Sequence, residues 1–129
     1  MHPESRKIKS FTDLIVWQNG HRAVLDIYKI TGQFLKEEQC GLTSQLRRSA
    51  VSFTSNIAEG FSRTSPRDKA RFYAMALGSL TEAQNQLLVA RDIGYLETPM
   101  FRKIADQTVE LNKMTNGLIK KTPSLLLAS

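Results

Sequence analysis

Cysteine and histidine are scarce in this chain, and their scarcity limits the chemistry available to it. The single cysteine, Cys40, has no partner for an intramolecular disulfide and cannot build a cysteine-rich zinc site, which fits a reducing cytoplasm. There are only two histidines, and the Glu-x-x-His pairs that hold iron in helical bundles are absent. The sequence therefore predicts no bound metal ion and no other cofactor.

Other familiar signals are also missing. The chain has no glycine-rich phosphate loop, no His-Glu-x-x-His and no nucleophile elbow, so we expect no enzyme. No apolar run approaches the ~20 residues of a membrane span. Residues 2–10 are polar and basic, unlike a secretory signal. These features predict a cytoplasmic protein that makes no use of a membrane.

What is present is the composition of a globular domain. The 129 residues are 41% hydrophobic and 23% charged, which suits one domain with a single core. The formal net charge is +6, and a basic protein favours anionic partners such as nucleic acid or an acidic protein. A modest positive charge of this kind also serves solubility alone, and the sequence leaves both interpretations open.

Apolar residues recur at helical spacing in four segments. The first begins after a cap at Thr12 or Asp13 and ends at Gly32, and the second spans 41–60, with Gly60 as its terminating residue. The third starts at the Ser65-Pro66 pair and runs to about Gly94, and the fourth runs from Thr98-Pro99 to Thr122-Pro123. The last two carry heptad stripes: Tyr73, Ala76, Leu80, Ala83, Leu87 and Ala90, then Ile104, Thr108, Leu111, Thr115 and Leu118.

Four helices with short links and no strand-like alternation predict an all-α, antiparallel up-and-down four-helix bundle. We place the bundle at residues 12–122, after a flexible basic arm at 1–11 and before a C-terminal tail at 123–129 that contains three leucines, Leu125 to Leu127.

Several segments of the sequence resemble a known family. They read DL at 13–14, VWQ at 16–18, GLTSQLRRSAVS at 41–52, SNIAEG at 55–60, ALGSLTE at 76–82 and GYL at 94–96. Together they are similar to the four-helix-bundle proteins encoded in intervening sequences of bacterial 23S ribosomal RNA genes. The resemblance covers most of the chain, from about Asp13 to Ile119.

This resemblance implies a bundle that assembles into a ring-like homopentamer. It also implies kinship with the accessory variability proteins of diversity-generating retroelements, which bind nucleic acid and a reverse transcriptase. Two departures stand out. Phe53-Thr54 replaces the Ile-Pro common in the family, which removes a kink, and Gln84 stands where a second acid after Glu82 is common.

The segment 41–60 is unusually polar for a buried helix. Arg47 and Arg48 cannot both face the core that Leu46 and Ala50 occupy, so at least one meets solvent, a subunit interface or a ligand. We favour assembly and packing over phosphate binding for both, with Glu59, Glu82 or a neighbouring subunit's acid as partner. Asn56 is expected to form a helix-to-helix hydrogen bond, and Glu59 is expected to pair with Arg63. Trp17 is expected to pack in the core or in an interface, with His21 beside it as a core residue.

Positive charge gathers just downstream of that segment. Residues 47–71 hold six lysines and arginines against two acids, which accounts for most of the net charge. We therefore predict an anion site made by Arg63, Arg67, Lys69 and Arg71 beside the positive end of the third helix dipole. The expected function is a nucleic-acid-binding accessory module that recognises phosphate. The alternative is a structural ring that docks another protein through its apolar faces or tail.

Overall fold

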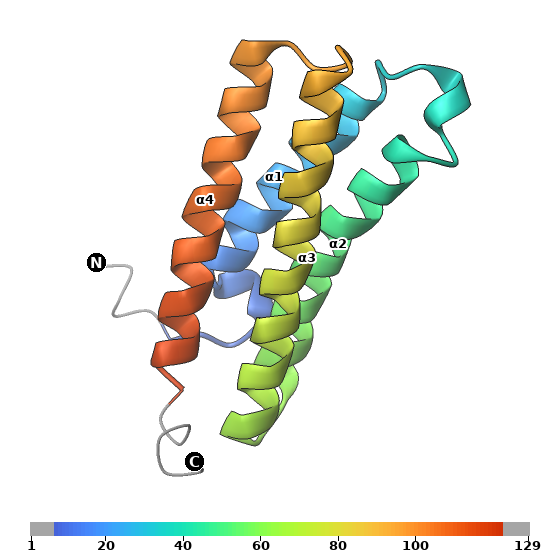
Figure 1. Ribbon diagram of the computed structural model, residues 1–129. Helices are drawn as coiled ribbons and strands as arrows, with labels where there is room; N and C mark the ends of the chain where they lie inside the picture. Colours follow the sequence, from blue (N-terminus) through green and yellow to red (C-terminus); the bar gives the residue numbers. More distant parts are fainter. Residues whose placement is uncertain (1–6, 123–129) are drawn as a thin grey trace.

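The computed structural model describes residues 7–122, which form four α-helices and two single 3-10 turns. In chain order these are η2 (Phe11–Asp13), α1 (Ile15–Thr31), η3 (Lys36–Glu38), α2 (Leu42–Ser62), α3 (Pro66–Asp92) and α4 (Thr98–Lys120). Successive helices run in opposite directions, and each packs against two neighbours, α1 on α2 and α4, and α3 on α2 and α4 (Figure 1). The described residues contain no strand. The predicted four-helix bundle is confirmed.

Both heptad stripes face the core of the bundle, and only Leu118, at the end of the α4 stripe, is partly buried. All six stripe residues of α3 are buried, as are Ile104, Thr108, Leu111 and Thr115 of α4. The two buried threonines of the α4 stripe keep their hydroxyls satisfied by bonding back to their own helix: Thr108 donates to the Ala105 carbonyl and Thr115 to the Leu111 carbonyl, each at 2.7 Å. These two polar side chains therefore lie in the core of the bundle without losing a hydrogen bond.

The first helix begins differently from the prediction. Ser10 caps the short turn η2, its hydroxyl accepting from the Thr12 amide while the Asp13 carboxylate accepts from the Ser10 amide. α1 follows with Leu14 as its N-cap, which has no side-chain oxygen. Thr12 and Asp13, predicted as caps of the first helix, lie instead within η2, one or two residues before the N-cap of α1. Gly32 ends α1 as expected.

Gly60 does not end the second helix, which continues for two further residues to Ser62. Gly60 is instead buried where α2 packs against Phe72 and Tyr73 of α3. A Cβ atom at this position would lie 2.5 Å from Cε1 of Tyr73 and 3.2 Å from Cβ of Phe72. The prediction of a terminating glycine was wrong because the residue is required for close helix packing rather than for a left-handed turn.

The start of α3 is confirmed, since the Ser65 hydroxyl accepts from the Asp68 amide at 3.0 Å and Pro66 is the first helical residue. α4 also has a proline in its first turn, but the helix already begins at Thr98, so Glu97 rather than Thr98 is its N-cap. Most of the predicted arm and the whole C-terminal tail lie outside the described residues. No helix within 7–122 is long and apolar enough to cross a membrane.

Candidate nucleic-acid interface

The up-and-down topology brings the α2–α3 turn to the same end of the bundle as the start of η2 and the end of α4 (Figure 1). We call this the basic end, comprising residues 7–14, 59–71 and 117–122. It carries eight lysines and arginines against three acids: Lys7, Lys9, Arg63, Arg67, Lys69, Arg71, Lys120 and Lys121 against Asp13, Glu59 and Asp68. Segments far apart in the sequence thus concentrate the positive charge of the chain at one pole.

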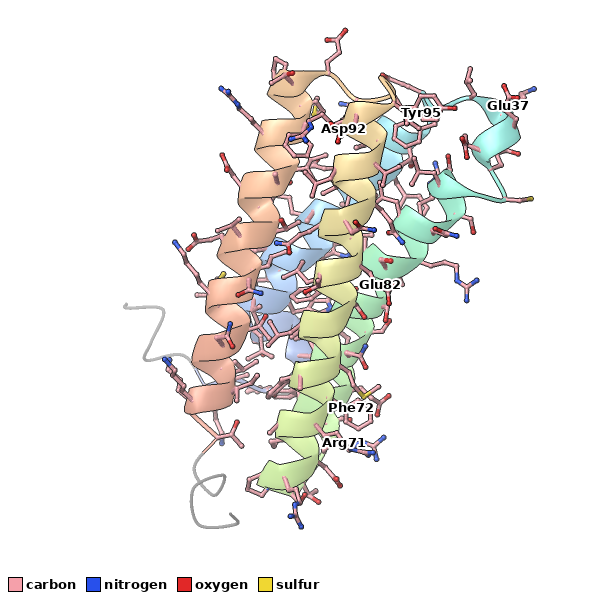
Figure 2. All side chains as sticks on the ribbon, viewed as in Figure 1. Glu37, Arg71, Phe72, Glu82, Asp92 and Tyr95 are labelled. Carbon is pink, nitrogen blue, oxygen red and sulfur yellow. The ribbon has the colours of Figure 1, made fainter. Side chains whose placement is uncertain are left out.

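The opposite end has the reverse balance. Its turns, residues 32–41 and 91–98, hold two basic residues, Lys36 and Arg91, and four acids. Figure 2 shows three of its side chains, Glu37, Asp92 and Tyr95, far along the bundle from Arg71 and Phe72 near the basic end. A bundle charged in this way is an electrostatic dipole whose positive pole attracts polyanions.

Arg63 and Arg71 both contact one aromatic ring, that of Phe72, which was not predicted from the sequence. The guanidinium carbons of Arg63 and Arg71 lie 4.6 and 5.2 Å from the centre of the Phe72 ring. Arg63 also donates to the Glu59 carboxylate at 3.0 Å, which confirms the predicted pair one helical turn apart. Because the Arg63 side chain remains 42% exposed, its charge is oriented but still accessible.

Lys69 has a structural contact that the sequence did not reveal. Its ammonium group donates to the Phe61 carbonyl at 2.7 Å and to the Gly60 carbonyl at 3.4 Å. Both carbonyls belong to the last turn of α2, at the negative end of its dipole, and that of Gly60 also accepts from the Arg63 amide, so the Lys69 cation adds to the cap of the helix. Lys69 contributes charge to the basic end, but two of its three donors are already engaged.

Arg67 and Arg71 lie on α3 four residues apart, both exposed to solvent. One helical turn separates them, about 6 Å along the axis at ~1.5 Å per residue. Arg67 forms no hydrogen bond or ion pair within residues 7–122. With Arg63 on the preceding turn, these two side chains present a row of cations next to the positive end of the α3 dipole.

Arg47 serves packing. Its Nε donates to the Thr31 hydroxyl at 2.8 Å, its Nη2 donates to the Tyr28 carbonyl at 3.3 Å, and its guanidinium lies over the Tyr28 ring. It therefore satisfies the C-terminal turn of α1 rather than pairing with Glu59 or Glu82, the partners considered from sequence. Arg47 is half-buried, whereas Arg48 is exposed.

Arg48 and Glu82 line a polar groove between α2 and α3 of about 500 Å³. The other lining residues are Gln45, Ser49, Ser52, Ser79 and Gln86. Glu82 accepts only a long bond of 3.4 Å from the Ser49 hydroxyl, and Arg48 and Glu82 form no ion pair with each other. The groove thus holds one cation and one anion that are unpaired within the described part of the chain.

Asn56 bonds within its own helix, donating to the Ser52 carbonyl at 3.0 Å and contacting the Ser52 hydroxyl at 3.3 Å. Near this point, a hydrogen bond between α2 and α3 is made instead by the hydroxyls of Ser52 and Ser79, 2.8 Å apart. The helix-to-helix role predicted for Asn56 was therefore misplaced by one turn. Small hydroxyl residues permit this bond because they let the two backbones come close.

Trp17 is half-buried in the core cluster at the basic end and stacks on His21, with ring centres 4.8 Å apart. His21 is exposed, so its expected place in the core was wrong. Position 21 lies just outside the buried stripe of α1, and stacking on the indole places the imidazole at the surface. No group of three or more histidine, cysteine, aspartate or glutamate side chains within 7–122 is arranged to hold a metal ion.

Two comparisons with known proteins find relatives of this chain. A family model described as 23S rRNA-intervening sequence protein matches residues 12–117. A crystal structure from Bacteroides thetaiotaomicron, described as a protein of unknown function from the S23 ribosomal protein family, is 21% identical. It superposes with a TM-score of 0.77 over 83% of this chain and 96% of its own. No curated protein matches. The family resemblance seen in the sequence is confirmed.

Proposed function

The chain belongs to the family of 23S rRNA-intervening sequence proteins, and we propose that it binds the phosphate backbone of nucleic acid through its basic end, without catalysing a reaction. The observation that supports this most is the convergence of three distant segments into one pole with eight basic side chains and three acids. The family description refers to an intervening sequence of 23S rRNA, and this association with RNA agrees with a nucleic-acid partner.

The recognition would be electrostatic. Arg63, Arg67 and Arg71 place guanidinium groups at the surface, and a guanidinium donates two parallel hydrogen bonds to a phosphate. Each phosphate that is neutralised releases counterions, so the affinity would fall steeply with added salt. The acidic opposite end repels the same polyanion, and this orients the bundle as it approaches.

The test is fluorescence polarisation of labelled RNA and DNA over a salt series. The triple variant Arg63→Gln, Arg67→Gln, Arg71→Gln removes three charges from the basic end. A matched control, Lys29→Gln, Lys36→Gln, Arg102→Gln, removes three exposed charges from the other end of the bundle. We expect the first variant to reduce the slope of log affinity against log salt by about 2, and the control to change it by less than half as much.

Two results would contradict this proposal. One is the lack of any binding at low salt by the wild-type protein. The other is an equal loss in the two triple variants, because that would show that only the total charge matters. Circular dichroism of both variants, followed by a thermal melt, confirms that the fold is unchanged.

We also propose that copies of the chain assemble into a ring through the outer face of α2 and α3. Between Arg71 and Arg91, α3 carries a single charge, Glu82, while Met75, Leu88 and Val89 are exposed along the same helix. Exposed apolar side chains beside an unpaired Arg48 and Glu82 suit an interface in which a neighbouring copy supplies the missing partners. A homopentamer would display five basic ends and bind a polyanion by many weak contacts.

Native mass spectrometry and light scattering test the assembly. We expect a pentamer for the wild type and smaller species for Arg48→Glu or Glu82→Arg alone. The double reversal should restore part of the assembly if the two side chains pair across the interface. A monomer at micromolar concentration would refute the ring, and the structural scaffold alternative would then have no support either.

A further inference from the structure

The arginines of the basic end are arranged around an aromatic ring, and this arrangement bears on which form of nucleic acid they hold. Phe72 is half-buried on α3, where its Cβ faces Gly60 of α2. The guanidinium groups of Arg63 and Arg71 both lie over its ring, at 4.6 and 5.2 Å from the centre. Arg63, in the turn after α2, and Arg71, on α3, thus share one anchoring surface.

An arginine that rests on an aromatic ring is oriented in a particular way. The attraction between the cation and the ring face restricts the flexible side chain, while the opposite face and the N–H groups at its edge remain available. Arg63 is restricted further by its hydrogen bond to Glu59. Phe72 itself is half-buried, with both guanidinium groups over its ring, so the arginines are the more exposed part of the cluster.

A guanidinium plane offers two kinds of contact at once. Its edge donates hydrogen bonds to a phosphate, and its face stacks on a nucleobase. Stacking requires a base whose own face is uncovered. Bases in a duplex are stacked on one another and paired, whereas those of a single strand can turn outward. Positive charge alone does not distinguish a single strand from a duplex. Two guanidinium planes held on an aromatic ring can do so, because they can stack on the exposed bases of a single strand.

We propose that the basic end prefers single-stranded nucleic acid, with unpaired bases stacking on the guanidinium groups of Arg63 and Arg71 while Arg67 contacts phosphate. This inference rests on the proposed function of the same surface. It adds a ligand class, an unpaired strand, and a physical reason for it, the Arg63–Phe72–Arg71 cluster.

The decisive variant is the double substitution Arg63→Lys, Arg71→Lys. It keeps every positive charge but replaces each planar group with an ammonium that cannot stack. We measure affinities for a single-stranded oligonucleotide without secondary structure and for a duplex of the same length at one salt concentration. We expect the wild type to favour the single strand, and the variant to lose about five-fold or more of that affinity. Its affinity for the duplex should fall by a clearly smaller factor, since lysine keeps the charge but not the paired hydrogen bonds to phosphate.

Phe72→Leu is the second variant, since it keeps both arginines but removes the ring that orients them. We expect it to weaken binding to the single strand more than to the duplex. A matched control, Phe101→Leu, removes a ring that lies under Arg91 at the other end of the bundle and should change neither affinity. Thermal melts of all variants verify that each one is folded.

The outcomes separate this inference from the proposed function. If neither nucleic acid binds at low salt, the proposed function fails, and this inference fails with it. If both bind equally well and the lysine variant loses nothing, the basic end binds phosphate by charge alone, and only the single-strand preference is overturned. An equal loss for single strand and duplex in the lysine variant would also overturn it.

Discussion

Substituting Gly60 by alanine tests the packing that positions the basic end. In the middle of an exposed helix, replacing glycine by alanine stabilises a protein by about 1 kcal/mol, because the backbone loses less entropy on folding. Gly60 lies within α2, so helix propensity alone predicts that alanine raises the free energy of unfolding. The structure predicts a loss, since the added methyl group would lie 2.5 and 2.8 Å from two atoms of the Tyr73 ring.

The loss of stability expected for Gly60→Ala depends on whether the Tyr73 ring can move away from the added methyl group. The Tyr73 side chain is 3% exposed and lies within the core cluster at the basic end, so its ring cannot swing into solvent. Overpacking of a filled core costs about 1–3 kcal/mol, and a clash this close belongs at the upper end of that range. After the gain in helix propensity is subtracted, we expect a net loss of about 1–2 kcal/mol.

Gly78 provides the matched control, because it also lies inside a helix but has nothing within 4 Å of its would-be Cβ. Gly78→Ala should raise the free energy of unfolding by about 1 kcal/mol, so the two variants should differ by at least about 2 kcal/mol. Urea unfolding followed by circular dichroism measures both. Equal stabilisation by the two alanines would refute the close approach of α2 and α3 at Gly60.

Two further predictions concern other contacts between elements. Arg47→Met removes the donors to the Thr31 hydroxyl and the Tyr28 carbonyl and should cost about 1–3 kcal/mol in urea unfolding; no loss would show that the contact is not stabilising. Burial, assisted by the hydrogen bond to Glu38 and its charge, raises the pKa of Tyr95. Its contribution to stability is therefore complete below the unfolded pKa of about 10 and is lost as the pH rises through the folded value. Tyr95→Phe should melt with less pH dependence than the wild type above pH ~10, and identical alkaline profiles would contradict this.

The fold was largely predictable from the sequence because the signals that define it are local. The stripe from Tyr73 to Ala90 repeats without interruption, and all its members are buried. The Ser65-Pro66 start needs only the neighbouring Asp68 amide to be satisfied. Spacing and caps of this kind act within one helix, so one sequence is enough to reveal them.

The wrong predictions concern residues whose main contacts are made with another helix. Gly60 looks like a helix terminator until the Tyr73 ring is placed against it, and Lys69 looks like an exposed cation until the end of α2 lies beside it. Arg47 has its partner on α1 rather than an acid. Such pairings depend on the angle and register between helices, which periodicity does not specify.

The candidate site was predictable in part. Charge counting located Arg63, Arg67 and Arg71, since they are close in sequence. It did not reveal that α4 and the segment before α1 add their lysines at the same pole, or that Phe72 lies beneath two of the arginines. The available signal was Phe72 directly after Arg71 in a basic stretch. By itself it is weak evidence, because the sequence does not show that Arg63 lies over the same ring.

The most direct test of the proposed function is to map the contact by nuclear magnetic resonance. Amide and arginine side-chain signals of the labelled protein would be followed during titration with an unstructured single-stranded oligonucleotide at low salt. We predict that the largest shifts fall within residues 63–71 and on the arginine side chains of that segment, with little change at 32–41 and 91–98. Shifts centred on the acidic end or the polar groove, or none at saturating oligonucleotide, would contradict binding through the basic end.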